Sequence, residues 1–292
     1  MKTFLPSRFW IKVFSLFTVI RGYNIAVLII AQYLTSSYIL APNTGLLNVI
    51  FDSKLFALVL ATAFSAAAGY IINNFYDAEK DKINRPKKYL LENLISQQSQ
   101  LVFYFLLNGA SIIAAGFVSF NSILFFTIYI FSIWIYSSSL KRLFWISNIF
   151  ATLLVIVPFF AITLYFKNFE TIVVYHATFL FLVILTRDLI KDLENFKGDW
   201  VKQYQTFPVV FGYKLSKLLI TLSVMFTFLP IYWLIKSSIG LMTYYFYFTI
   251  PLLIILLIML WQGSTQKRYL WLHNLLKVHI LFGVLGIYFI YK

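Results

Sequence analysis

The uncharged run MTYYFYFTIPLLIILLIMLW, residues 242–261, decides the class of fold. About 20 apolar residues in an α-helix cross the hydrocarbon core of a bilayer. Similar runs recur along the 292 residues, which are 61% hydrophobic and 12% charged, whereas a soluble domain is about 45–50% apolar and about 25% charged. Because a backbone in lipid must pair its polar groups within helices or a closed barrel, we predict an all-α, polytopic membrane bundle. An ordinary soluble enzyme is excluded.

We expect nine membrane spans in a single integral-membrane domain that covers residues 1–292. The breaks between spans carry polar or turn-forming residues, for example Asn121-Ser122 and Gly263-Ser264. The second span is rich in Ala, Ser and Gly, which favours close helix packing. The expected spans are roughly 18–38, 55–74, 99–118, 121–139, 145–166, 171–187, 215–235, 242–261 and 271–290.

The distribution of Lys and Arg predicts the orientation of the chain. Twenty of these 24 residues lie on one predicted side of the membrane and four on the other. Under the positive-inside rule the basic side is cytoplasmic. We interpret the net charge of +14 as the topology signal of a multi-pass protein, in the plasma membrane if the source is prokaryotic, and not as a nucleic-acid-binding surface. The basic segments are the N-terminus through Arg21, the 75–98 loop, Lys141-Arg142, 187–217 and 262–277.

Seven of the ten carboxylates fall in two short windows at the cytoplasmic ends of the second and sixth spans. In the first window, Asn73, Asp77 and Asp81 repeat at i, i+4 and i+8, and they share one face if the helix continues past Asn74. The second window repeats the pattern at i, i+4, i+7 and i+11. Carboxylates scattered over loops would not form two such stripes. The second stripe consists of Asp188, Asp192, Asn195 and Asp199.

The chemistry of these side chains indicates a metal–diphosphate site. Oxygen ligands without His or Cys favour a hard cation, and Mg²⁺ commonly combines one or two carboxylates with substrate phosphate oxygens. The chain has no Cys, which excludes zinc–thiolate sites and thiol nucleophiles. Lys and Arg alternate with the acids in both windows and are suited to binding anionic oxygens. The three histidines, His176, His273 and His279, are interpreted as packing or interfacial residues rather than bases.

Both windows resemble the two Asp-rich motifs of the UbiA family of intramembrane prenyltransferases. Residues 73–81, NNFYDAEKD, are similar to the first motif, N-D-x-x-D-x-x-x-D, and residues 83–86, INRP, are similar to the sequence that often follows it. Residues 187–199, RDLIKDLENFKGD, are similar to the second motif. Residues 206–212, TFPVVFG, are similar to the T-L-P-x-x-x-G that follows in the family. The resemblance covers nearly the whole chain.

The sequence departs from the family pattern at two positions. Asn74 stands where the family usually has the first Asp of its first motif, and Asn195 stands where the archaeal lipid-type branch often has another Asp. An amide oxygen can ligate Mg²⁺ but carries no charge. The two departures leave two consequences open: a lower metal affinity, or one metal held mainly by the substrate. A weakened or repurposed member of the family is the alternative.

The resemblance implies an enzyme that binds an isoprenyl diphosphate with Mg²⁺ as cofactor. The allylic C–O bond would ionise and a membrane-soluble acceptor would then attack the prenyl carbon. The expected partners are this diphosphate, the acceptor and the lipid bilayer, with the active site facing the cytoplasm. The implied catalytic residues are Asp77, Asp81, Asp188 and Asp192, the implied metal ligands are these four and Asp199, and the implied substrate-binding residues are Asn24, Asn73, Arg85, Lys141 and Lys191.

The acceptor is less well defined by the motifs. INRP and KDLENFKGD look most like the branch that prenylates geranylgeranylglyceryl phosphate to make ether lipids. A quinone-precursor prenyltransferase, acting on a naphthoate or hydroxybenzoate type of acceptor, is the alternative within the family. Outside the family the alternative is a cation-coupled transporter, although transporters place their ion-binding carboxylates near the membrane midplane. Prenyl chain length and oligomeric state stay open.

Overall fold

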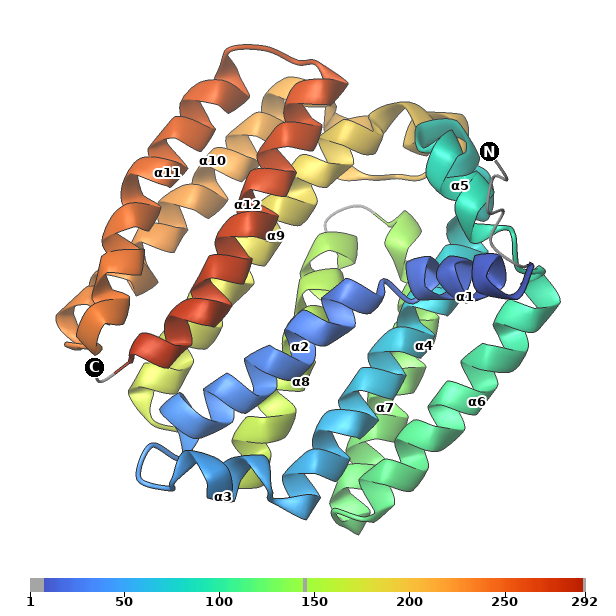
Figure 1. Cartoon of the computed structure of the whole chain (residues 1–292). Coiled ribbons are helices and arrows are strands. Elements are labelled where there is room, and N and C mark those ends of the chain that lie inside the picture. The colour runs from blue at the N-terminus through green and yellow to red at the C-terminus, as the bar shows by residue number, and fades with distance from the viewer. Residues whose placement is uncertain (1–7, 144–145, 291–292) are drawn as a thin grey trace, which may run out of the picture. The chain divides into compact units, whose positions relative to one another are not determined.

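The computed structural model describes residues 8–143 and 146–290, and within these ranges it contains helices and no strand. Nine helical segments of this part of the chain are long and apolar enough to cross a membrane. The prediction of an all-α fold with nine membrane-spanning helices is confirmed over these residues, whose elements are drawn in Figure 1. The chain is an integral, multi-pass membrane protein.

Three short helices lie outside the spans: α1 (Arg8–Val19), α3 (Leu46–Ile50) and α5 (Pro86–Glu92). Four spans are made of an α-helix and an adjoining short π- or 3₁₀-helical turn, labelled η. The spans are α2 (Gly22–Thr35) with η1 (Ser36–Leu40), α4 (Ser53–Asn84), α6 (Gln97–Gly116), α7 (Phe120–Ser138) with η2 (Leu140–Arg142), α8 (Ile146–Phe166), α9 (Thr171–Val201), α10 (Phe207–Lys236), η3 (Gly240–Met242) with α11 (Thr243–Trp261), and α12 (Gln266–Gly286) with η4 (Ile287–Phe289).

One compact unit consists of the chain up to Ile29 together with Ala57–Ser138. Within it, α4 runs beside α6 and α7 (Figure 1), and the small side chains of α4 permit close approach. Ser111 of α6 donates a hydrogen bond from Oγ to the carbonyl oxygen of Ala61 in α4, at 2.8 Å. A Cβ added to Gly69 of α4 would lie 3.1 Å from Cγ2 of Ile133 in α7. Helix α7 therefore packs tightly against α4 at this glycine.

The second compact unit consists of Ile30–Phe56 and Ser139–Lys292. Within it, α9 packs against α8, α10 and α12, and α11 packs against α10 and α12 (Figure 1). Ile190 and Leu193 of α9 are fully buried. The helix that carries the second acidic window is therefore enclosed by three neighbouring helices.

Two spans extend further than predicted. Helix α4 continues to Asn84 instead of ending near 74, and α9 continues to Val201 instead of ending near 187. The prediction ended both helices where the apolar residues end, but the i to i−4 hydrogen bonds of a helix persist where its side chains become polar. The condition on which the first acidic stripe depended is therefore met, and both stripes lie on continuous helices.

The break before the fourth span was predicted at Asn121-Ser122, and that prediction is wrong. Helix α7 already begins at Phe120. The Oγ of Ser119 accepts a hydrogen bond from the backbone N–H of Ser122 at 3.1 Å, as an N-cap residue does. The polar residues here begin a helix instead of separating two. Two further spans begin earlier than predicted, α10 at Phe207 and α12 at Gln266.

Helix α10 contains one irregular residue, Gly212, with φ 77° and ψ 176°. An L-amino acid with a side chain is disfavoured at positive φ, whereas glycine tolerates it. The family-like stretch 206–212 therefore ends at a position where the backbone needs glycine.

Candidate active site

The first acidic window lies on the C-terminal part of α4. Because α4 is unbroken here, Asn73, Asp77 and Asp81 follow one face at one-turn intervals. The Oδ1 of Asp77 lies 3.4 Å from Nζ of Lys80, and the Oδ2 of Asp81 lies 2.7 Å from Nζ of Lys88. The side chains of the two acids are only 12% and 15% exposed. Both carboxylates are therefore shielded from water and paired with lysines.

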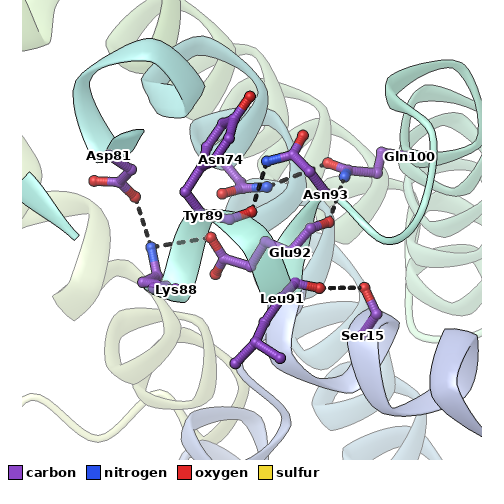
Figure 2. Close-up of polar contacts among 9 residues, drawn as sticks. All are labelled: Ser15, Asn74, Asp81, Lys88, Tyr89, Leu91, Glu92, Asn93 and Gln100. Carbon is purple, nitrogen blue, oxygen red and sulfur yellow. Dashed lines mark hydrogen bonds and ion pairs between the residues drawn. The ribbon is translucent and has the colours of Figure 1, made fainter. Parts of the chain in front are cut away.

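Asn74, the position of the first departure from the family motif, takes part in a different set of contacts. It is buried, and its Nδ2 donates to Oε1 of Gln100 in α6 at 3.3 Å (Figure 2). Nε2 of Gln100 donates in turn to the carbonyl oxygens of Glu92 and Ile95, at 3.0 and 3.2 Å. One step along a helix turns a side chain by about 100°. Asn74 therefore stabilises the α5–α6 connection through Gln100. Its side chain lies on a different face of α4 from that of Asp77.

The short helix α5 follows the first window and contacts both α4 and α1 (Figure 2). Nζ of Lys88 lies between Oδ2 of Asp81 and Oε2 of Glu92, at 2.7 and 3.2 Å. On another side, Ser15 of α1 donates from Oγ to the carbonyl oxygen of Leu91 at 2.8 Å. Glu92 is buried, and burial raises the pKa of its carboxyl above the ordinary value although Lys88 partly offsets the effect.

Asn24, a predicted substrate-binding residue, is placed beside α4. Its Nδ2 donates to the hydroxyl of Tyr70 at 3.2 Å, and the guanidinium carbon of Arg21 lies 4.9 Å from the centre of the same ring. Tyr70 is three residues before Asn73 on α4, so the two share a face. Asn24 thus contacts the face of α4 that carries the first acidic window.

The second acidic window lies on α9, with Asp188 and Asp192 one turn apart. NH1 of Arg187 lies 3.2 Å from Oδ1 of Asp188. The Nδ2 of Asn148, buried in the first turn of α8, donates to Oδ2 of Asp192 at 2.8 Å. Sequence reasoning missed Asn148. The signal that could have found it is an amide in the first turn of an otherwise apolar span.

Another acid of the second window faces elsewhere. Glu194, two residues after Asp192, projects from nearly the opposite side of α9. Its Oε2 lies 2.8 Å from Nδ1 of His273 in α12, and both side chains are buried. His273 was interpreted as a packing or interfacial residue rather than a base. It is buried, and its partner is a carboxylate of the second window.

The remaining predicted residues lie on the expected elements. Two belong to the first compact unit and three to the second. They are Asn73 (half-buried, α4) and Arg85 (half-buried, immediately before α5), then Lys141 (buried, η2), Lys191 (half-buried, α9) and Asp199 (buried, α9).

The donor set fits a hard divalent cation. All the candidate ligand atoms in the two windows are carboxylate or amide oxygens, which suit Mg²⁺ and not zinc or copper. Within residues 8–143 and 146–290, no three His, Asp or Glu side chains come together as a ready-made metal cage. Mg²⁺ typically needs only one or two carboxylates when phosphate oxygens complete its shell. The paired carboxylates therefore suit a metal that arrives with a diphosphate.

The family relationship follows from comparison with known proteins. The UbiA prenyltransferase family matches residues 25–281, which is most of the chain. The chain belongs to the UbiA prenyltransferase family. This confirms the resemblance inferred from the two Asp-rich motifs, and with it an enzyme of the prenyltransferase class. Membership in this family also counts against the transporter alternative.

Among the curated relatives of this UbiA-family chain are several digeranylgeranylglyceryl phosphate synthases. That of Korarchaeum cryptofilum is 28% identical over 254 residues, which are 85% of this chain and 90% of the relative. That of Thermococcus kodakarensis is 32% identical over 197 residues, 65% of this chain and 69% of the relative. The names of these relatives agree with the branch of the family that the short motifs most resemble.

Solved structures support the UbiA fold. A structure described as digeranylgeranylglyceryl phosphate synthase in membranes matches with a TM-score of 0.71 at 20% identity, covering 95% of this chain and 97% of that one. A UbiA homologue from Archaeoglobus fulgidus bound to GPP and Mg²⁺ matches with a TM-score of 0.68 at 15% identity, covering 94% and 99%. At these identities the likeness shows the fold alone.

Proposed function

We propose that this UbiA-family enzyme transfers an isoprenyl group from an isoprenyl diphosphate to a phosphorylated glycerol lipid of the geranylgeranylglyceryl phosphate kind. The observation that carries the proposal is the pair of carboxylate stripes, Asp77 with Asp81 on α4 and Asp188 with Asp192 on α9. The synthases at 28–32% identity support the choice of acceptor. The Mg²⁺ and GPP bound to the Archaeoglobus homologue support the choice of metal and donor.

The reaction breaks the allylic C–O bond of the donor, and the electron pair leaves with the diphosphate. The hydroxyl oxygen of the acceptor forms a new C–O bond to the prenyl carbon, and its proton passes to the diphosphate product. In the transition state, negative charge develops on the leaving diphosphate and positive charge develops on the prenyl carbon. Catalysis therefore requires that both charges be stabilised. Groups placed in advance around the leaving diphosphate lower the barrier.

Each acidic window would supply metal ligands: Asp77 and Asp81 in the first, and Asp188 and Asp192, with Asp199 as a further one, in the second. Mg²⁺, when bound, supplies positive charge that neutralises the departing diphosphate. The lysine and arginine side chains would bind diphosphate oxygens not taken by metal. Asn148 would orient Asp192, because its amide fixes one carboxylate oxygen at 2.8 Å. The proposed basic and polar contacts are Asn24, Asn73, Arg85, Lys141 and Lys191.

The whole chain would act as one membrane domain with its polar helix ends in the cytoplasm. The support for this orientation is the excess of Lys and Arg on the side that carries both acidic windows. The donor and acceptor both have lipid tails, so both would reach the enzyme from the bilayer while their polar groups stay at its cytoplasmic surface.

The test is a transfer assay in membranes that contain the full chain. Labelled geranylgeranyl diphosphate is supplied with geranylgeranylglyceryl phosphate, with a naphthoate, or with a hydroxybenzoate, each with and without Mg²⁺. The proposal predicts a labelled lipid product with the first acceptor only, and only with Mg²⁺. Product formed from an aromatic acceptor instead would establish the quinone-precursor alternative.

The matched variants are Asp192→Asn on α9 and Glu170→Gln at its N-cap, each of which removes one negative charge. Asp192→Asn is predicted to reduce transfer at least about 100-fold, since removal of a charge-stabilising group in an active site has effects of this order. Glu170 is exposed at the opposite end of α9, so Glu170→Gln should leave transfer unchanged. Full activity of Asp192→Asn would remove the second window from the active site.

A further inference from the structure

Lys88 lies between two carboxylates that have different surroundings. Its Nζ is 2.7 Å from Oδ2 of Asp81 on α4 and 3.2 Å from Oε2 of Glu92 on its own helix α5 (Figure 2). The side chain of Lys88 is 26% exposed, that of Asp81 15% and that of Glu92 only 2%. The ammonium therefore bridges a carboxylate of the acidic window and a carboxylate that is closed off from water.

Two hydrogen bonds attach α5 in addition to this ion pair. On one side the Oγ of Ser15 holds the carbonyl oxygen of Leu91 at 2.8 Å. On another side Nε2 of Gln100 holds the carbonyl oxygen of Glu92 at 3.0 Å. Both are hydrogen bonds between uncharged groups, and they dock the backbone of the helix. Burying an ionised carboxylate costs desolvation free energy unless the carboxylate is paired. Docking of α5 alone therefore does not explain why Glu92 is buried.

The charges around Asp81 suggest a role for the Lys88–Glu92 pair. Asp77 and Asp81 are one turn apart on one helical face, and like charges at this spacing repel each other. Lys88 reduces the repulsion by neutralising Asp81. Any other cation that binds Asp81 must compete with this ammonium. When it does so, Glu92 remains 3.2 Å from Nζ as an alternative partner on the same helix.

We propose that Lys88 is a placeholder cation for Asp81, and that Glu92 is the anchor that retains the ammonium when a divalent metal ion binds the Asp81 carboxylate. The proposal rests on the proposed function in one respect, that Asp81 is a metal ligand. It adds two positioning residues, Lys88 and Glu92, which lie outside both Asp-rich motifs. It also explains why a short connecting helix contains a buried acid.

The experiment measures metal binding by the purified full chain in detergent, in the absence of any diphosphate. Mn²⁺ is the probe, and its unbound fraction is followed by electron paramagnetic resonance. Lys88→Met removes the competitor, so the dissociation constant for Mn²⁺ should fall about five- to tenfold, the order expected for a nearby partly screened charge. Glu92→Gln removes a nearby negative charge and leaves the ammonium to Asp81 alone, so the dissociation constant should rise about threefold.

Lys87→Met is the matched control. Lys87 is the adjacent residue of α5, carries the same charge and is exposed to solvent. Its removal should change the dissociation constant less than about twofold, because exposed charges are screened. Lys88→Arg keeps the charge and should also stay within about twofold of the wild type. In an Asp81→Asn background, Lys88→Met should have no effect, since the competition is for that carboxylate.

Opposite shifts in Lys88→Met and Glu92→Gln support the proposal, because structural damage would weaken metal binding in both. The proposal is overturned if Lys88→Met binds Mn²⁺ no more tightly than the wild type, or if Lys87→Met has the same effect as Lys88→Met. It is also overturned if Asp81→Asn leaves the dissociation constant unchanged, since Asp81 is then not a ligand. If Lys88→Met does not fold, Glu92→Gln and Lys88→Arg decide the question. The transfer assay tests the proposed function separately, with different acceptors and a different readout.

Discussion

The amide of Asn148 donates a hydrogen bond to Asp192 across 2.8 Å, and this contact ties the first turn of α8 to the second acidic window of α9. Asn148 is buried, so the bond is sheltered from water. A carboxylate held at one oxygen has fewer orientations, and ligands held in this way bind metal better. If Asp192 holds metal as proposed above, this contact would make Asn148 a positioning residue for it.

Replacing this amide should weaken catalysis without unfolding the chain. Asn148→Leu is expected to reduce metal affinity or Mg²⁺-dependent transfer by about 10–100-fold, the usual effect of losing the partner of a metal ligand. Mn²⁺ binding and the transfer rate are measured together. Thr163→Val is the control, because Thr163 is also buried on α8 and its hydroxyl donates to the carbonyl oxygen of Phe159 in its own helix. Equal losses in both variants would mean that Asn148 serves only packing.

Restoring the aspartate of the family motif at position 74 should not improve the enzyme. Asn74→Asp loses the amide that donates to Gln100, and it buries a charge beside that residue. We expect a loss of about 1–3 kcal/mol in stability, the penalty for an unsatisfied buried polar group, and no gain in affinity for Mn²⁺. Thermal unfolding and Mn²⁺ binding are the measurements. Asn73→Asp, on the face of Asp77, is the comparison that should alter metal affinity, and a tighter site in Asn74→Asp would contradict the structure.

The buried Glu92 predicts a pH dependence of stability. Burial raises the pKa of its carboxyl above the ordinary 4.5, with Asp81 adding to the effect and Lys88 and Arg21 opposing it. The folded chain therefore binds this proton more tightly than the unfolded chain. The stabilising contribution is complete below about pH 4.5 and is lost as the pH rises through the raised pKa. Glu92→Gln cannot titrate, so it should gain stability relative to the wild type over this interval.

The measurement is the melting temperature of wild type and Glu92→Gln in detergent, from about pH 4 to about pH 8. Glu170→Gln, which removes an exposed carboxylate, should follow the wild type across the range. A constant difference between wild type and Glu92→Gln at every pH would show that the Glu92 carboxyl has the same pKa in the folded and unfolded chains.

The Glu194–His273 pair should support the fold of α9 against α12. Its atoms are 2.8 Å apart and both side chains are buried. His273→Phe leaves the Glu194 carboxylate buried without this partner, and we expect a loss of about 3 kcal/mol in stability. His279→Phe is the control, since the ring of His279 is also buried but meets the hydroxyl of Thr249 and the ring of Tyr245. Thermal unfolding measures the loss of stability in each variant, and His273→Phe should lose more than His279→Phe. A smaller loss for His273→Phe would contradict the stabilising role of the Glu194–His273 pair.

The class of fold and the positions of the two acidic windows could be predicted from the sequence. Apolar runs long enough to cross a bilayer leave few alternatives to helices, because lipid offers no partners for unpaired backbone groups. The one-face spacing of Asp77 and Asp81 was also correct once α4 continued past Asn74. The ends of the helices were less predictable. Polar residues such as Asn121 can begin, end or continue a helix, and the local hydrogen bonds decide which.

The sequence by itself determined that this is a UbiA-like membrane enzyme with carboxylates at two helix ends. It could not determine the partners of those carboxylates, because these come from residues distant in the chain. Asn148 reaches Asp192 across 44 positions, and Gln100 reaches Asn74 across 26. Only the packing of α8 on α9 and of α6 on α4 brings these amides within hydrogen-bonding distance. Local spacing governs which residues share a helical face, and tertiary packing governs what that face meets.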